Sequence, residues 1–330
     1  MNVLVTGGAG YIGSHTVHEL GRAGLKAVVY DNFAKGHQQA VPAGVVTVAG
    51  DIRDKERLAR AIADNHIEAV VHFAAASLVG ESMKEPSTYY NNNVAGTLAL
   101  LDAIMAGGVK KIVFSSTAAV YGEPAVWPID EDMPTAPTNV YGRTKLVIEH
   151  MLADFAAAYG LSYVSLRYFN AAGAMEGGTI GEDHAPETHL IPLILQAALG
   201  QRDSIVIFGT DYPTGDGTCI RDYIHVSDLA DAHVRALRHL AAGGRPRVYN
   251  LGSETGYSVR QVIDRAKAVT GVDFTVREED RRPGDPAVLL ASSRRIKAEL
   301  GWQPRSSDLD TIIASAWRWH KAHPHGFSRP

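Results

Sequence analysis

The chain opens with Met1-Asn-Val-Leu-Val-Thr6, which runs directly into Gly7-Gly-Ala-Gly-Tyr-Ile-Gly13. The apolar residues predict a short β-strand over 3–6, and the glycines predict a tight turn that opens a helix. Glycine lets the backbone turn sharply and approach a ligand closely, and the N–H groups at a helix N-terminus favour phosphate oxygens. The spacing Gly-x-x-Gly-x-x-Gly therefore indicates a dinucleotide diphosphate site, with an ordinary strand-to-helix turn as the alternative.

Composition narrows the class of protein. The chain has 330 residues, 45% of them hydrophobic, and a net charge of −4, which are values of a globular protein and argue against nucleic acid as a partner. A single cysteine, Cys219, excludes an internal disulfide and suits a reducing compartment. No apolar run is long enough to span a membrane, and the chain begins with a strand rather than a signal peptide. We expect a soluble, cytoplasmic protein without a metal site, because the histidines are scattered.

Short apolar runs alternate with helical patterns through the first half of the chain. Strands are expected at 3–6, 26–30, 45–48, 69–73, 111–115 and 163–168, and helices at 15–23, 55–65, 91–105 and 139–159. This alternation is typical of a parallel sheet that helices cover on both faces. The sequence therefore predicts an α/β fold with a Rossmann-type doubly wound parallel sheet.

The pattern changes after residue 170, where a polar loop over 171–187 leads to a helix at 189–199. Later helices are expected at 258–270, 293–300 and 309–321, and strands at 223–225 and 248–251 could rejoin the first sheet. We predict that residues 1–170 form a dinucleotide-binding domain to which segments near 221–254 return. Residues 171–220 and 255–330 are then a smaller α/β substrate-binding domain. The cleft between the two is the expected ligand site.

Acidic residues follow the second and third strands. Asp31 lies at the end of the second strand, where a carboxylate can accept hydrogen bonds from both ribose hydroxyls of an adenosine and repel a 2′-phosphate. Asp31 and Asn32 therefore indicate NAD rather than NADP, with a plain turn as the alternative. Asp51-Ile52 ends the third strand, where the adenine would lie, and Asp51 could equally cap the next helix.

The chemistry centres on Tyr141-Gly-Arg-Thr-Lys145. Residues four apart lie on one face of a helix, and a positive charge beside a phenol lowers the pKa of the phenol. The pair therefore predicts a general base that acts near pH 7, with a surface Tyr–Lys pair as the alternative. Thr117 ends the fifth strand, where its hydroxyl can contact a substrate hydroxyl or merely cap a turn.

These motifs resemble the extended short-chain dehydrogenase/reductase family, and within it the UDP-glucose 4-epimerases. The resemblance covers the whole chain. It also includes Val79-Gly-Glu-Ser82, Tyr89-Tyr-Asn-Asn-Asn-Val94, Leu166-Arg-Tyr-Phe-Asn170, Ile207-Phe-Gly-Thr-Asp-Tyr-Pro-Thr214 and Arg221-Asp-Tyr-Ile-His-Val226.

The resemblance assigns roles residue by residue. Tyr141 is the acid–base residue, Lys145 is its electrostatic partner, and Thr117 contacts the sugar. The implied NAD site contains Gly7, Gly10, Tyr11, Ile12, Gly13, Asp31, Asn32, Asp51, Ile52, Phe73, Ala74, Ala75, Ser77, Asn92, Ser115, Tyr141, Lys145, Tyr168 and Phe169. The implied UDP-sugar site contains Thr117, Asn170, His189, Leu190, Val206, Ile207, Phe208, Arg221, Arg282, Asp285 and Leu289. Without the resemblance, we would interpret Arg221 and Arg282 as members of surface salt bridges.

By this resemblance, the reaction inverts C4 of a UDP-hexose through a transient 4-keto sugar, with NAD held tightly. UDP-N-acetylhexosamines and UDP-pentoses remain alternative substrates, because Leu289 has an intermediate size for the sugar pocket. A 4,6-dehydratase needs an Asp-Glu pair after the strand threonine, where this chain has Ala118-Ala119. A non-catalytic regulator that senses NAD is a further alternative. Such proteins commonly lack the Tyr or the Lys, and this chain keeps both.

Two positions depart from a common family pattern. Ser77 replaces a lysine near the cofactor diphosphate, and His189 replaces an asparagine before an apolar helix.

A further expectation concerns assembly. The helix over 91–105 carries Val94, Leu98, Leu101 and Met105 beside Leu100 and Ile104, so it is apolar on more than one face. We expect it to pair with the helix over 139–159 in a homodimer, with deeper burial inside one chain as the alternative.

Overall fold

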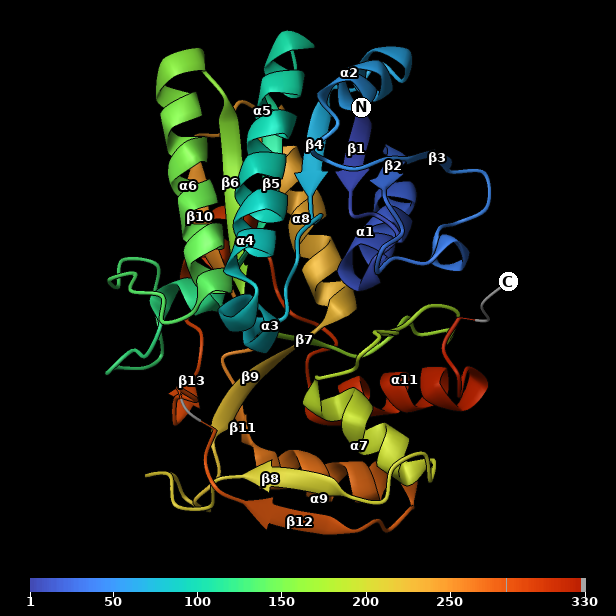
Figure 1. Ribbon diagram of the computed structural model, residues 1–330, viewed down its shortest axis with the longest axis vertical. Helices are drawn as coiled ribbons and strands as arrows, with labels where there is room; N and C mark the ends of the chain where they lie inside the picture. Colours follow the sequence, from blue (N-terminus) through green and yellow to red (C-terminus); the bar gives the residue numbers. More distant parts are fainter. Residues whose placement is uncertain (283, 328–330) are drawn as a thin grey trace.

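A computed structural model describes residues 1–282 and 284–327 (Figure 1). Its larger part is a seven-stranded sheet of order β10-β6-β5-β4-β1-β2-β3, in which every neighbouring pair is parallel. The doubly wound sheet is thus confirmed. The strands are β1 (Asn2–Thr6), β2 (Lys26–Asp31), β3 (Val46–Ala49), β4 (Ala69–His72), β5 (Lys111–Thr117), β6 (Ser162–Tyr168) and β10 (Arg247–Leu251).

Helices cover both faces of this sheet, so its central strands read as continuous apolar runs. On one face α1 (Tyr11–Arg22) packs beside α8 (Val226–Ala241), and their leucines and valines share one core with β1, β5 and β6. On the other face lie α2 (Lys55–Asp64), α5 (Gly96–Ala106) and α6 (Val140–Tyr159). The chain reverses strand order between β1 and β4, which is where doubly wound sheets open a crevice for ligands.

The helix that carries Tyr141 has clear start and stop signals. The side chain of Asn139 accepts a hydrogen bond from the N–H of Gly142 at 2.8 Å, and caps the first turn of α6. Gly160 ends the helix with a φ of 69°, a left-handed conformation that glycine adopts without strain. Both signals lie in the sequence, and the predicted helix over 139–159 is confirmed.

Three features of the fold differ from the expectations. The first residues of the expected helix over 91–105 form a π-helical turn over Tyr90–Ala95, and the α-helix proper begins at Gly96. Two short helices, α3 (Val79–Lys84) and α4 (Pro86–Tyr89), come before the turn. Helix α8 was not expected at all. The strand expected at 223–225 belongs to β9 (Ile220–His225), which does not join the large sheet and pairs instead with β7 (Asn170–Ala172), β11 (Gly256–Ser258) and β13 (Val288–Leu289).

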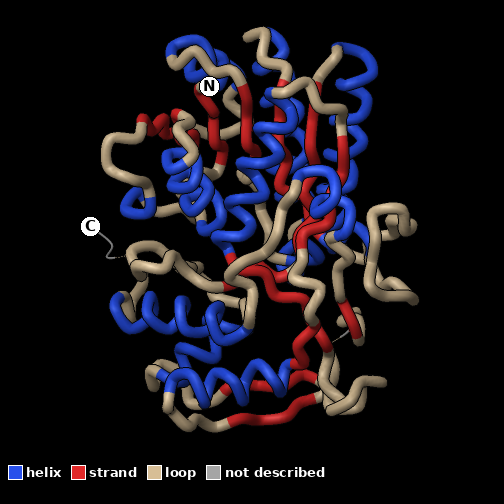
Figure 2. The backbone as a smooth tube through the Cα atoms, turned by 180° about the vertical axis from the view of Figure 1, so that it is seen from behind, coloured by secondary structure: helices blue, strands red, loops and turns tan. Residues whose placement is uncertain are grey.

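The smaller part lies beyond the carboxyl ends of the large sheet (Figure 2). It contains α7 (Leu190–Ala198), α9 (Val259–Thr270) and α11 (Leu309–Ala322), whose isoleucines and leucines share a separate core. A two-stranded parallel sheet of β8 (Ile205–Phe208) and β12 (Val276–Glu279) forms its outer edge, and α10 (Arg294–Leu300) leads back to the larger part. Among the described residues, no helix is long and apolar enough to cross a membrane.

Candidate active site

A cavity of about 910 Å³ lies between the carboxyl ends of the large sheet and the smaller part. Most of the predicted site residues line it, from Gly7 and Asp31 at one end, past Tyr141 and Lys145, to Arg221 and Asp285 at the other. Residues far apart in the sequence therefore meet in one space. Its size suits a dinucleotide and a second ligand better than a single small metabolite.

The glycine turn lies very close to the segment that follows β4. Gly7 has a φ of 72°, and a Cβ there would lie 2.7 Å from the backbone nitrogen of Ala74. A Cβ on Gly13 would lie 2.1 Å from the carbonyl oxygen of Gly7. Side chains at these positions would push the turn apart. Helix α1 then begins at Tyr11, with its N-terminus beside the cavity. The turn thus offers the backbone cradle that a cofactor diphosphate requires.

Asp31 and Asp51 have different surroundings. Asp31 is buried and accepts hydrogen bonds from the N–H groups of Ala9 (2.9 Å) and Phe33 (2.8 Å), which ties the end of β2 to the glycine turn. Burial raises its pKa, and these N–H donors oppose that rise. Asp51 is outside the cavity lining and forms a two-point ion pair with Arg53, which holds its pKa at about 2. Asp31 thus faces the predicted ribose, whereas Asp51 shapes the loop after β3.

Tyr141 and Lys145 lie one helical turn apart on α6. The Lys145 ammonium lies 5.8 Å from the centre of the Tyr141 ring and donates a 2.8 Å hydrogen bond to the carbonyl oxygen of Ser115. Thr117 ends β5, and its hydroxyl lies beside the Tyr141 phenol. Ser115 also hydrogen-bonds the Tyr168 hydroxyl through a short contact. A phenol, an ammonium and two hydroxyls therefore converge beside the cavity.

Burial controls the proton affinities of the Tyr–Lys pair. It raises the pKa of Tyr141 to about 12, although the hydrogen bond with Thr117 acts the other way. It also lowers the pKa of Lys145 to about 7, against the pull of Glu149. That Lys145 and a bound oxidised nicotinamide together bring the phenol close to neutrality stays a prediction. Removal from water disfavours both charged forms.

Buried polar groups hold this part of α6 in place. Asn93, in the π-helical turn, binds the backbone of Ala76 in both directions and donates to the Thr144 hydroxyl at 3.1 Å. On the opposite side of α6, Glu149 pairs with Arg167 of β6 at 2.5 and 2.9 Å. π-Helical turns occur frequently at functional sites. Here the turn places Asn93 between Ala76 and Thr144, and Thr144 directly precedes Lys145 on α6.

The far end of the cavity is built from charges. Asp285 accepts hydrogen bonds from both Arg221 and Arg282, and the Arg282 guanidinium lies 4.8 Å from the centre of the Phe208 ring. Arg221 is largely buried, whereas Arg282 is 59% exposed. Leu289 of β13 is paired in register with Arg221, and it lines the same cavity as Arg221 and Tyr141. Guanidinium groups in this arrangement suit phosphate oxygens.

The predicted residues fall into two groups. Those that line the cavity are Gly7, Gly10, Tyr11, Ile12, Gly13, Asp31, Asn32, Ile52, Phe73, Ala74, Ala75, Ser77, Asn92, Ser115, Thr117, Tyr141, Lys145, Tyr168, Phe169, Asn170, His189, Leu190, Arg221, Asp285 and Leu289. Those outside the lining are Asp51, Val206, Ile207, Phe208 and Arg282. Sequence reasoning missed Lys35, Glu182, His184 and Tyr223, which also line it. Lys35, Glu182 and His184 lie in segments without a regular pattern, so only their side-chain chemistry gave a signal, whereas Tyr223 lies in the expected strand over 223–225.

Known proteins resemble this chain over its whole length. The sequence model of the NAD dependent epimerase/dehydratase family matches residues 3–252. A UDP-glucose 4-epimerase of Halalkalibacterium halodurans is 55% identical over 99% of this chain and 98% of its own. A crystal structure of a UDP-glucose 4-epimerase has a TM-score of 0.98 at 52% identity, with both chains covered completely. A UDP-glucose 4-epimerase of Bifidobacterium longum, solved with NAD⁺ and UDP, has a TM-score of 0.94 at 40% identity and covers 99% and 100% of the two chains.

The chain belongs to the NAD dependent epimerase/dehydratase family. The site residues fit the cofactor that this family uses. The close backbone approach at Gly7 and Gly13 matches a diphosphate, and the buried carboxylate of Asp31 matches an unphosphorylated ribose. Within the family, Ala118 and Ala119 follow Thr117, so the chain lacks the acid–base pair that a dehydratase would use there.

Proposed function

We propose that this chain interconverts UDP-glucose and UDP-galactose by inverting C4 of the sugar. The observation that carries the proposal is the meeting of Tyr141, Lys145 and Thr117 in one cavity with a dinucleotide turn and a pair of arginines. The high identity to UDP-glucose 4-epimerases over the whole chain supports it. We also propose the domain division and the site roles given by the sequence.

The chain's own groups supply the proton chemistry. Tyr141 takes the proton from the C4 hydroxyl and later returns it, and Thr117 orients that hydroxyl. NAD, which the glycine turn and Asp31 would hold, would supply the hydride acceptor for C4, and Lys145 favours the Tyr141 phenolate. Lys145 is buried and Tyr141 is half-buried beside the cavity, which limits the access of water to the reacting C4.

The nucleotide is held at the other end of the cavity. We propose that Arg221 binds the UDP diphosphate and Asp285 the uridine ribose, and that Arg282 and the strand Val206–Phe208 close this side. Inversion requires that the sugar presents both faces to the cofactor while UDP stays anchored. Strong binding at UDP and weak binding at the sugar allow that motion.

One incubation tests the proposal. The purified protein is mixed with UDP-galactose without added NAD, and the nucleotide sugars are separated by ion-exchange chromatography. We expect UDP-glucose to form, because the returned hydride makes the cofactor catalytic and tightly held. Tyr141→Phe is the matched control and should form almost none. The absence of UDP-glucose with the wild type, with or without added NAD, contradicts the proposal.

Leu289 sets the expected sugar specificity. It lines the cavity and has a side chain of intermediate size. We therefore propose preference for UDP-glucose and UDP-galactose, and expect Leu289→Ala to raise kcat/KM for UDP-N-acetylglucosamine relative to UDP-glucose. An unchanged ratio contradicts this role.

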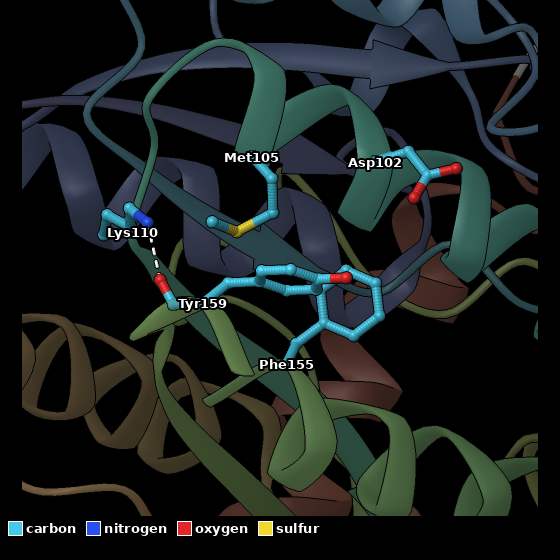
Figure 3. Close-up of a pocket in the computed structure, with 5 residues that line it drawn as sticks. All are labelled: Asp102, Met105, Lys110, Phe155 and Tyr159. Atoms are coloured by element: carbon cyan, nitrogen blue, oxygen red, sulfur yellow. Dashed lines mark hydrogen bonds between the residues drawn. The ribbon is translucent and has the colours of Figure 1, made fainter. Parts of the chain in front are cut away.

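We propose a homodimer through α5 and α6. Leu98 is 43% exposed on α5, and Val147 (36%) and Tyr159 (57%) are exposed on α6. A hollow of about 360 Å³ lies where Met105 of α5 faces Phe155 and Tyr159 of α6 (Figure 3). Of the apolar residues expected on a second face, Leu101 is instead fully buried with Leu100 and Ile104. Light scattering should give twice the chain mass, and a Leu98→Glu, Val147→Glu variant should be monomeric. A monomeric wild type contradicts the dimer.

We also propose a cytoplasmic location. It rests on the lone cysteine, Cys219, because a chain without disulfides suits a reducing compartment. Cys219 is buried, and burial raises the pKa of its thiol, so we propose that it is structural rather than reactive.

A further inference from the structure

Four side chains converge in the segment between β7 and α7. Glu182, His184, Glu187 and His189 each present one ligand atom, and these four atoms all lie within 4.8 Å of one another. The segment borders the cavity, and α7 begins at Leu190, directly after the last of them. None of these four residues is needed for the proton chemistry of Tyr141.

The distances match those between neighbouring ligands of a tetrahedral metal. His184 Nδ1 lies 3.2 Å from Glu182 Oε1 and 3.7 Å from Glu187 Oε2. With metal–ligand bonds of about 2.0–2.1 Å, the edges of a tetrahedron are about 3.3 Å long. A further pair, His189 Nδ1 to Glu182 at 2.5 Å, is a direct hydrogen bond that a bound ion would widen.

Two carboxylates are buried side by side here, and two neighbouring histidines balance them. The side chains of Glu182 and Glu187 are 4% and 6% exposed. Within residues 1–282 and 284–327, neither forms an ion pair with a lysine or an arginine, and their ion-pair partners are the two histidines. Burying two like charges side by side is costly unless a cation neutralises them. A divalent cation would do so with both histidines neutral.

The ligand set selects the kind of cation. Magnesium and calcium take six or more oxygen ligands, which this cluster does not offer. Two imidazoles with two carboxylates suit a first-row transition metal, and four ligands at tetrahedral spacing suit zinc. Backbone N–H groups of Thr188 and His189 donate to one Glu187 oxygen at 2.7 and 2.8 Å, and so orient the other oxygen toward His184. Such outer hydrogen bonds are usual around metal ligands.

We propose that Glu182, His184, Glu187 and His189 bind one zinc ion in a closed, structural site. The ion fixes the segment over 182–189 and the start of α7, whose residues Leu190–Pro192 line the cavity. Its role is to hold this wall of the cavity in place. This assigns His189 to the metal rather than to the UDP-sugar, and the chain can bind zinc whether or not it acts on a UDP-sugar.

Metal binding is measured directly. The full chain is dialysed against EDTA, desalted, and titrated with Zn²⁺ in competition with a chromophoric chelator, and bound zinc is counted by mass spectrometry. Two variants remove ligands, His184→Gln and Glu187→Gln. In the second variant the new amide oxygen can still accept the two backbone N–H groups, so this variant should fold. His150→Gln changes an exposed histidine of α6 and is the matched control. Circular dichroism checks the fold of each variant.

We expect one zinc per chain for the wild type and for His150→Gln. Loss of a direct ligand should weaken binding by more than about 100-fold, beyond the 10–100-fold that an outer-shell partner is worth. Cobalt(II) should give the intense visible bands of a tetrahedral ion, and zinc should slow amide exchange in residues 182–192. Less than about a tenth of an equivalent of zinc in the wild type overturns the proposal, as does equal binding in the two ligand variants. A weak, octahedral cobalt spectrum also overturns the closed site.

Discussion

The two ends of the cavity are built on different principles. At the Tyr141 end, the reactive groups are carried by long regular elements, and Lys145 is 3% exposed. At the Arg221 end, short strands and a loop carry the charges, and Arg282 is 59% exposed. Burial at the first end shifts the pKa values of both Tyr141 and Lys145, whereas at the second end solvent reaches Arg282 and screens its charge. The first end is thus suited to chemistry and the second to reversible anchoring.

Tyr141→Phe should have the largest effect on this contrast. Loss of a positioned acid–base group costs about 10²–10⁴-fold in rate, so kcat for UDP-galactose should fall by that factor. The far end of the cavity is untouched, so the Kd for UDP, measured by calorimetry, should stay within about twofold. Normal turnover in this variant would remove Tyr141 from the mechanism.

Glu149→Gln tests the support beneath α6. The change leaves Arg167 buried without its counter-charge, which costs about 3–5 kcal/mol in the free energy of unfolding. Urea denaturation followed by circular dichroism measures the loss. Asp310→Asn breaks the exposed pair with Arg265 and should leave the urea midpoint unchanged. Equal effects of the two variants would show that burial does not distinguish these pairs.

Lys145→Met removes the cation beside the phenol. An opposite charge at this range lowers a phenol pKa by about 1–3 units, so without it the rise of kcat with pH should shift upward by at least about one unit. Activity lost near pH 7 should therefore recover partly near pH 9. The pH dependence of kcat measures this, and an unshifted profile would contradict the electrostatic role of Lys145.

Arg221→Ala and Arg282→Ala compare the anchoring charges with each other. The largely buried Arg221 should matter more, and its loss should raise the KM for UDP-galactose by about 10–100-fold with little change in kcat, since charged hydrogen bonds contribute about 1.5–3 kcal/mol. Exposed Arg282 should change KM by less than about fivefold. A fall in kcat alone would place these arginines with the chemistry instead.

His233→Phe should have the smallest effect, on stability rather than rate. Burial lowers the pKa of His233 to about 4, so the folded chain keeps this ring neutral while the unfolded chain protonates it near pH 6.5. Stability is therefore lost as the pH falls from about 6.5 to 4, by about 1.4 kcal/mol per pH unit. The variant should show a correspondingly shallower pH dependence in urea denaturation between pH 6.5 and 4.5. An identical slope would mean that His233 is not neutral in the folded state.

Local signals in the sequence determined much of the fold. Glycine spacing at 7, 10 and 13, apolar strand runs and the caps of α6 act over a few residues, so the parallel sheet and the Tyr141–Lys145 face could be predicted from them. The partner of β9 could not, because strand pairing depends on contacts between segments distant in the chain. The π-helical turn at Asn93 was likewise hidden, since its stabilising bonds go to Ala76 and Thr144.

The tertiary structure alone decided the electrostatics and the cluster before α7. From sequence, Lys145 lies one helical turn from Tyr141; the fold adds removal from water, which disfavours the charged form of each group. The sequence also shows Glu182, His184, Glu187 and His189 as scattered polar residues of a loop. Only the folded backbone turns their ligand atoms toward one point. Sequence thus determined which chemical groups are present, and burial and distance determined which of them act together.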